Sequence, residues 1–331
     1  METPIGEAGP LHEEEEAGLA ARAAWWYHAA GLTQSQVADK LGVTNAKAHR
    51  LIARATRAGH VRVFVEGPIG SCIALEQALS DRFGLCFCRV VPTIDACAMP
   101  LRELGLAAAA FLRDAVEADT HRLIGVGHGR TLATAIDFMP RLPCPKLRLV
   151  TLLGGLPRRY RANPFEVIDR FADKTGADAF LLPVPMFARE EADTAVLHRQ
   201  FGVPEAIALA AEASLLVMGI GSLRSGAFLS LAGVITPAEL AEVRDAGAEG
   251  EMLGYFYDAG GRLIDTPLHR RVVGNPLTRS ALVATPRRQV VAVAGGPDKA
   301  TAITAVLQSG LLTGLITDEL TARLLAAAAA A

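Results

Sequence analysis

The chain has 331 residues, of which 51% are hydrophobic and 5% aromatic, and its 33 basic and 35 acidic side chains leave a net charge of −2. This length allows about two domains, and the composition excludes a disordered, coiled-coil or collagen-like chain. No apolar run reaches the roughly 20 residues of a membrane helix, and the acidic N-terminus is unlike a signal peptide, so we expect a cytoplasmic protein without a membrane partner.

The charge reverses sharply near the N-terminus. Residues 1–17 carry six acidic side chains and no Lys or Arg, which predicts a flexible acidic tail. Between residues 33 and 65, six basic side chains accompany a single acid, Asp39. We therefore predict a DNA-binding domain over 18–66 and a larger domain over 67–331.

Residues 33–58 have the pattern of a helix-turn-helix. Thr33 and Gln36 form a capping box that begins one helix, Gly42 permits the turn, and Thr44 caps a second helix. A further helix near 18–30 is expected to close the small core. The predicted core positions are apolar: Val37, Ala38, Leu41, Ala48, Leu51, Ile52, Ala55, Trp25 and Trp26.

The outer face of the second helix is basic. Placed in a major groove, its N-terminal residues would contact base edges and its later arginines would contact phosphates. We assign Asn45, Lys47 and His49 to bases and Arg50, Arg54 and Arg57 to phosphates, with Gln34 and Thr44 as further candidates. The alternative is a helical hairpin with a solvated basic face. Residues 60–67 resemble the strand or wing that often follows such a helix.

From about residue 70 onward, short apolar runs alternate with amphipathic stretches. This alternation predicts a doubly wound, mainly parallel α/β sheet that is covered by helices on both faces. The expected strands are 85–91, 122–127, 147–153, 177–184, 214–221, 289–296 and 311–317.

The segment LIGVGHGRTLATAI (123–136) is the sharpest local feature of the larger domain. A buried strand ends in glycines around His128, and Arg130 and Thr131 open a helix. Backbone amides, an electropositive helix N-terminus and two side-chain donors suit a phosphate or a cluster of polyol hydroxyls. The segment is neither a dinucleotide fingerprint nor a Walker loop, and a plain strand-to-helix turn remains the alternative.

Other glycine-rich turns follow predicted strands, and ligands bind beyond the carboxyl ends of parallel strands. Lys299 near a helix N-terminus suggests a nearby anion, or else a solvated lysine. Asp258 and Asn163 either reach the pocket or only form a turn and a helix cap. The candidate effector residues are Gly127, His128, Gly129, Arg130, Thr131, Gly154, Gly155, Asn163, Gly219, Gly221, Asp258, Gly295 and Lys299.

We find no catalytic constellation with recognisable local context and expect neither an enzyme, a metal site nor a cofactor. The rival interpretation is a sugar-phosphate isomerase or deaminase-like enzyme with an added helix-turn-helix, for which Asp258, Glu251 and His128 offer a general base. A third is a DNA-binding protein whose larger half only oligomerises. The five cysteines lack a C-x-x-C pair and indicate packed thiols, with a redox or metal role as the alternative.

From about residue 15 to 331, the chain resembles the SorC-type sugar-binding transcriptional regulators of bacteria. The resemblance rests on the helix-turn-helix followed by GVGHGRT, LLGG, GIGS, AGGPDKATAI and LLTGLITDELTA in this order. The subgroup that controls erythritol catabolism is similar in VTNAKAHRLIARA, VFVEG and LIGVGHGRTLATAI.

The resemblance implies an effector domain whose fold is like that of the sugar-phosphate isomerases, and a tetramer on operator DNA. It also implies a sugar, polyol or phosphorylated effector. Such a regulator is usually a repressor of a sugar or polyol catabolic operon. Residues 127–131 would correspond to the family's effector-phosphate loop, Lys299 to its effector-contacting lysine, and Asp258 to an acid that meets sugar hydroxyls. His128 and Arg130 stand where many relatives carry smaller or hydroxylated residues, which leaves a free polyol open.

Overall fold

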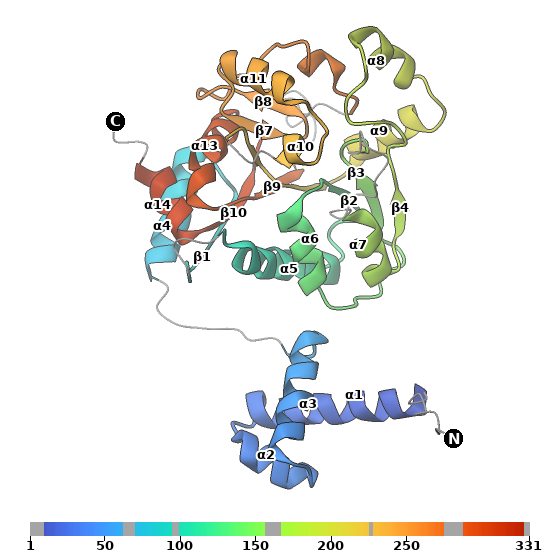
Figure 1. Ribbon diagram of the computed structural model, residues 1–331, viewed down its shortest axis with the longest axis vertical. Helices are drawn as coiled ribbons and strands as arrows, with labels where there is room; N and C mark the ends of the chain where they lie inside the picture. The colour runs from blue at the N-terminus through green and yellow to red at the C-terminus, as the bar shows by residue number, and fades with distance from the viewer. Residues whose placement is uncertain are drawn as a thin grey trace, which may run out of the picture. The chain divides into compact units, whose positions relative to one another are not determined.

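The computed structural model describes residues 10–61, 70–94, 99–155, 167–224, 228–274 and 287–327. The chain divides into two compact units, residues 1–68 and 69–331, each with its own hydrophobic core (Figure 1). Among the described residues, no helix combines the length and the apolar character that crossing a membrane requires.

The N-terminal unit consists of helices α1 (Pro10–Ala24), α2 (Gln34–Leu41) and α3 (Asn45–Arg57), with a short π-helix, η1 (Trp25–Ala29), after α1. Small side chains let the helices pack closely, since Ala38 and Ala48 are buried in the core. The predicted helix-turn-helix core is confirmed, with one exception. Trp26 packs against the core, but Trp25 is 61% exposed.

The predicted flexible tail over 1–17 was too long. Helix α1 begins at Pro10, so that residues 10–17 are helical. The sequence permits this helix because proline is favoured at a first helical position. Glutamate is a good helix former, and its charge suits the N-terminal turn.

The larger unit is built on a seven-stranded sheet in the order β1-β10-β9-β5-β2-β3-β4, in which every strand pair is parallel. All seven predicted strands are present. They are β1 (Phe87–Val91), β2 (Leu123–Val126), β3 (Arg148–Thr151), β4 (Asp178–Phe180), β5 (Leu215–Met218), β9 (Gln289–Val293) and β10 (Gly314–Asp318).

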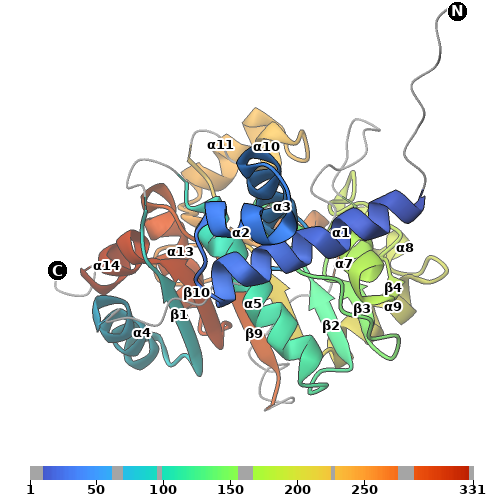
Figure 2. The ribbon, with the colours of Figure 1, turned by 90° about the horizontal axis from the view of Figure 1, so that it is seen from below.

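Helices cover both faces of this sheet, as the sequence predicted (Figures 1 and 2). Side chains alternate between the faces because the strand repeat is two residues. In β5, for example, Leu215 and Val217 pack with α5 (Leu101–Glu117), α6 (Arg130–Phe138) and α7 (Ile168–Thr175). Leu216 and Met218 pack on the other face, which carries α4 (Gly70–Phe83), α9 (Val203–Glu212), α13 (Ala300–Gln308) and α14 (Glu319–Ala327).

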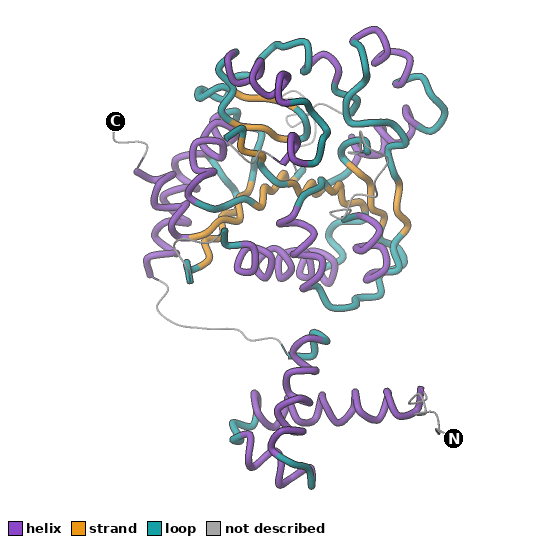
Figure 3. Tube along the Cα trace, in the orientation of Figure 1, coloured by secondary structure: helices purple, strands orange, loops and turns teal. Residues whose placement is uncertain are grey.

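A second, three-stranded antiparallel sheet is inserted between β5 and β9 of the chain (Figure 3). It comprises β6 (Gly221–Ser222), β7 (Gly250–Met252) and β8 (Tyr255–Tyr257). The seven predicted strands do not include β7 or β8, and β6 replaces the end of the predicted strand 214–221. The remaining helical elements are α8 (Glu191–Leu197), α10 (Phe228–Leu231), α11 (Pro237–Asp245), η2 (His269–Arg271) and η3 (Pro297–Lys299).

The order of the strands reverses at β2. The chain runs from β2 through β3 to β4 at one edge, then returns to place β5 on the opposite side of β2. In open parallel sheets, this reversal leaves a crevice beyond the carboxyl ends of the two strands, where ligands bind. The turns that follow β2 and β5 are therefore the expected walls of a binding site.

Candidate functional site

Helix α3 displays the basic face that the sequence predicted. Thr44 caps it by accepting the Lys47 amide at 3.3 Å, and Gly42 ends α2 in the left-handed region at φ 65°. These two features orient α3 against α2 and leave its polar residues outward. Asn45, Lys47, His49, Arg50 and Arg57 are exposed.

Two of the candidate DNA-binding residues, Gln34 and Arg54, contact another helix of this unit. Gln34 donates its side-chain amide to the carbonyl oxygen of Asn45 at 3.0 Å, which ties the start of α2 to the start of α3. Arg54 is half-buried and forms an ion pair with Glu16 of α1. Their roles toward DNA stay predictions, and Arg54 would have to exchange a carboxylate for a phosphate.

A cavity of about 410 Å³ lies in the larger unit and is lined by the turns that follow β2 and β5. Its walls combine apolar side chains with a few charged ones. The residues that line it are Met99, His128, Gly129, Arg130, Thr131, Leu132, Leu153, Met186, Gly219, Ile220, Gly221, Ser222, Leu223, Arg224, Leu229, Ile235, Glu251, Leu253, Val293, Asp298 and Lys299. Seven of the predicted effector residues therefore meet at one cavity.

The turn after β2 brings backbone and donor groups to the cavity. Gly129 has a φ of 126°, where a side chain would be strained, and a Cβ added there would meet open space. Helix α6 begins directly after it at Arg130, without a side-chain cap. The first amides of a helix lack partners within the helix, so this terminus suits an anionic or hydroxylated ligand.

His128 is uncharged at neutral pH. Burial lowers the pKa of His128 to about 4, against a smaller opposing effect from a hydrogen bond with the backbone of Leu153. A neutral imidazole carries one donor and one acceptor. His128 therefore supplies the cavity with hydrogen-bonding capacity rather than with positive charge.

Lys299 and Glu251 place opposite charges at the cavity. Burial lowers the pKa of the Lys299 ammonium, and so does nearby Arg130, whereas Glu251 raises it. Burial raises the pKa of Glu251 to about 7, opposed by a hydrogen bond from the Gly254 amide at 2.7 Å and by the charge of Lys299. Lys299 also donates to the carbonyl oxygen of Ile220 at 3.2 Å. The lining thus carries three cations, Arg130, Arg224 and Lys299, and two acids. The acids are Asp298 and Glu251, and Glu251 can be neutral or ionised near neutral pH.

Gly154, Gly155 and Gly295 do not line the cavity, contrary to prediction. A Cβ on Gly154 would come within 2.2 Å of the Val184 carbonyl oxygen, and the Gly155 amide donates to that oxygen at 2.8 Å. A Cβ on Gly295 would lie 2.3 Å from Asp318 Oδ2. Close packing against neighbouring segments explains Gly154 and Gly295.

Asp258 and Gly127 also lie outside the lining. Asp258 Oδ1 accepts the amides of Gly260 at 2.9 Å and Arg262 at 2.8 Å, so it forms the turn that the sequence left as its alternative role. Gly127 passes close to β5, since an added Cβ would be 3.2 Å from that of Met218. Asn163 and most of the predicted wing, residues 60–67, fall outside the described residues.

Sequence reasoning did not assign several lining residues to the effector. Glu251 was considered only as a possible catalytic base, although an acid within the apolar hairpin 250–257 is a usable signal. Leu229, Ile235 and Met186 come from segments whose approach depends on tertiary packing. Among the described residues, no group of His, Cys, Asp and Glu side chains could hold a metal ion.

Comparisons with known proteins agree with this architecture. Residues 67–327 match the sugar-binding domain family. The chain is 45% identical over 307 residues to the erythritol catabolism regulatory protein EryD of Brucella abortus, covering 93% of this chain and 96% of that protein. It is 35% identical to the transcriptional regulator LsrR of an Enterobacter species, covering 96% and 94% of the two chains.

A solved structure shares the fold over nearly the whole length. The full-length sorbitol operon regulator SorC from Klebsiella pneumoniae superposes with a TM-score of 0.68 at 22% identity, covering 94% of this chain and 99% of that one. The similar proteins are transcriptional regulators rather than enzymes.

Proposed function

Because the chain belongs to the SorC-type sugar-binding transcriptional regulators, we propose that it represses a sugar or polyol catabolic operon and that a small effector in the cavity changes its affinity for operator DNA. Helix α3 reads the operator, with Asn45, Lys47 and His49 on bases and Arg50, Arg54 and Arg57 on phosphates. The protein acts in the cytoplasm as a homo-oligomer, in a tetrameric arrangement.

The single observation that carries the effector half of this proposal is the composition of the cavity wall. Arg130, Lys299 and Glu251 face the same space, together with neutral His128 and the start of α6. Cations and amides hold a phosphate, whereas a carboxylate and an imidazole accept and donate to hydroxyls. A short phosphorylated polyol satisfies both kinds of group, and a free polyol satisfies the second.

Erythritol and its 4-phosphate are the first effectors to test. The relative of 45% identity is named for erythritol catabolism, and a cavity of about 410 Å³ lies in the usual size range of small-molecule sites. The family's effector residues would correspond to residues 127–131 and Lys299, and all of these except Gly127 line the cavity. Gly219 and Gly221 line the β5 side of the wall, and a Cβ added at Gly221 would come within 2.2 Å of Glu251 Oε2.

The mechanism is a population shift. The effector binds one arrangement of the effector domains more tightly, and that arrangement changes the spacing of the paired α3 helices. A coupling free energy of about 1–3 kcal/mol, typical of allosteric proteins, would change operator affinity roughly 5–150-fold.

The test is a fluorescence anisotropy titration of the full-length protein with the operator region, carried out with and without erythritol or erythritol 4-phosphate. We expect one of them to change the apparent Kd at least fivefold and to raise the melting temperature of the protein. No response to these compounds, nor to other tetritols, pentitols and sugar phosphates, would reject the effector half of the proposal. Turnover of any of them would favour an enzyme instead.

A further inference from the structure

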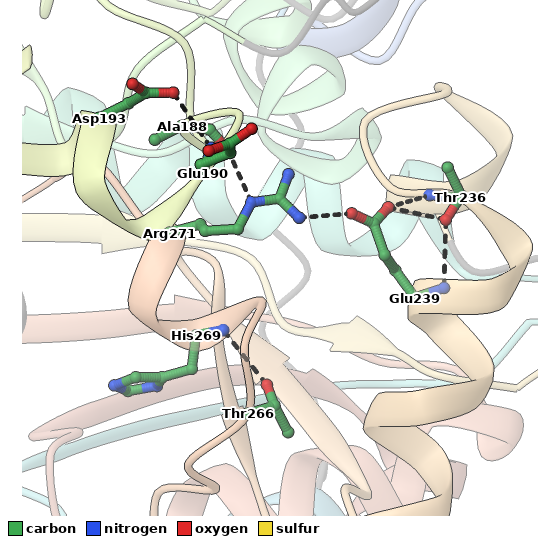
Figure 4. Close-up of polar contacts among 8 residues, drawn as sticks. All are labelled: Ala188, Glu190, Asp193, Thr236, Glu239, Thr266, His269 and Arg271. Atoms are coloured by element: carbon green, nitrogen blue, oxygen red, sulfur yellow. Dashed lines mark hydrogen bonds and ion pairs between the residues drawn. The ribbon is translucent and has the colours of Figure 1, made fainter.

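Arg271 joins three segments of the larger unit that are far apart in the sequence (Figure 4). Its Nε donates to the carbonyl oxygen of Ala188 at 2.8 Å, and one terminal nitrogen donates to Glu239 Oε1 at 2.7 Å. The Ala188 amide donates back to the Arg271 carbonyl oxygen at 2.7 Å. The ion pair is well shielded from solvent, with side chains that are only 16% and 17% exposed.

Glu239 uses its second oxygen to fix the start of α11. Glu239 Oε2 accepts the backbone amide of Thr236 at 2.6 Å and its hydroxyl at 2.8 Å. Thr236 in turn accepts the Glu239 amide at 3.1 Å, which completes a capping box. One carboxylate therefore holds both the N-terminus of α11 and the guanidinium of Arg271.

Each end of this chain of contacts reaches the effector cavity. Ile235, which lines the cavity, is bonded directly to Thr236. On the other side, Met186 lines the cavity, and its carbonyl oxygen accepts the Val273 amide at 2.8 Å. Phe187 bridges to Val272, one residue beyond Arg271. The Arg271–Glu239 ion pair thus connects two segments of the cavity wall, the one at Ile235 just before α11 and the one at Met186.

We propose that Arg271 and Glu239 are positioning residues that act as a latch between these two walls and keep the cavity in the shape that binds the effector. Neither residue touches the ligand. The proposal rests on the proposed function, because it assigns the retention of the effector to a contact outside the cavity.

The latch would act by setting the fraction of protein molecules whose cavity has the shape that binds the effector. If the latch is broken, the start of α11 can leave the position that places the preceding Ile235 against the cavity. The apparent Kd then rises in inverse proportion to the fraction of molecules that remain competent. A competent fraction of about one tenth would weaken effector binding about tenfold.

Glu239→Gln tests the charge of the latch without removing the cap, since glutamine is also accepted at this position of a capping box. Calorimetric titration with erythritol and with erythritol 4-phosphate should give a Kd about 5–30-fold higher than for the wild type. Arg271→Gln should have a similar effect, and the double variant should be no worse than the more affected single variant. Additive effects of the two substitutions on Kd would overturn the latch.

Arg270→Gln is the matched control. Arg270 lies beside Arg271 on η2 and pairs with Asp265 and Glu191, but these side chains are 42%, 73% and 65% exposed. Its loss should leave the effector Kd within about twofold of the wild type, because exposed pairs contribute little. An equal rise in Kd for Arg270→Gln would show a general electrostatic effect rather than a latch.

Hydrogen exchange of the ligand-free protein gives a readout that does not depend on the effector. In Glu239→Gln, amides of α11 and of residues 186–188 should exchange at least about fivefold faster, and those of β2 and β5 should not. Unchanged exchange in both segments would contradict the latch. If the wild type binds neither probe while these amides respond as expected, the proposed effector fails but the link between the walls stands.

Discussion

Lys299 and Glu251 line the same cavity, and each opposes the effect of burial on the pKa of the other. Lys299 favours the ionised carboxylate, and Glu251 favours the charged ammonium. Arg130 adds a second positive charge nearby, which lowers the pKa of Lys299. An anionic ligand would relieve the repulsion between Lys299 and Arg130, and we therefore expect a phosphorylated effector to bind more tightly than the free polyol.

The substitution Lys299→Met should separate phosphate recognition from hydroxyl recognition. Methionine retains an unbranched apolar stem but removes the charge, and a hydrogen bond to a charged group contributes about 1.5–3 kcal/mol. We therefore expect the Kd for erythritol 4-phosphate to rise roughly 10–150-fold, with a much smaller change for erythritol. Calorimetric titration measures both. An equal loss for the two compounds would assign Lys299 to the hydroxyl end of the ligand.

Glu251 makes the stability of the larger unit depend on pH. Because burial raises its pKa from 4.5 to about 7, the folded state retains a proton that the unfolded chain releases between these values. Its contribution is fully present below pH 4.5 and is lost as the pH rises through about 7. Glu251→Gln should therefore stabilise the protein at pH 8, by up to about 3 kcal/mol, and much less at pH 5.

Urea unfolding of the wild type and of Glu251→Gln at both pH values checks this prediction. The amide can still accept the Gly254 hydrogen bond, so the variant isolates the charge. A gain in the free energy of unfolding that is the same at pH 5 and pH 8 would show that the carboxylate is not responsible. A loss at pH 8 would mean that the pairing with Lys299 exceeds the cost of burial.

The sheet and the helix-turn-helix were predictable because local patterns determine them. Apolar runs such as 123–126 specify buried strands, and Thr33, Gln36 and Gly42 carry the chemistry of a cap and a turn. The extent of the acidic tail was not predictable from charge alone. A run of glutamates is compatible with both a solvated tail and a helix. In the structure, Glu16 of α1 forms an ion pair with Arg54.

The site was only partly predictable because a glycine-rich turn has more than one cause. Glycines after strands suggested backbone open to a ligand, which fits Gly129, where an added Cβ meets nothing. At Gly154 the same pattern serves the close approach of the Val184 backbone. Only tertiary structure separates these cases, and only it brings Ile235 and Met186 to the cavity.

Because Arg54 forms an ion pair with Glu16, we expect Glu16 and a DNA phosphate to compete for the Arg54 guanidinium. An arginine that neutralises a phosphate contributes about one unit to the salt dependence of binding. Arg54→Ala should therefore weaken operator and non-specific binding alike and reduce the slope of log K against log salt by about one. Glu16→Gln should strengthen binding, since it frees the guanidinium.

Anisotropy titrations at salt concentrations from about 50 to 200 mM give the slope of log K against log salt for both variants. Arg57→Ala, at an exposed position on the same helix, is the matched comparison. An unchanged slope for Arg54→Ala would mean that Arg54 serves only to hold α1 on α3. Weaker DNA binding by Glu16→Gln would lead to the same conclusion.

We expect Asp258 to stabilise its turn rather than to contact the ligand. Its Oδ1 accepts two backbone amides within its own turn, so Asp258→Ala should destabilise the protein by about 1–2 kcal/mol without changing the effector Kd. Asp258→Asn keeps an acceptor at the same position and should lose less stability. Thermal unfolding and calorimetric titration of both variants separate the two roles. If Asp258→Asn weakens erythritol binding while the melting temperature stays constant, the acid meets ligand hydroxyls, and the turn must open when the effector binds.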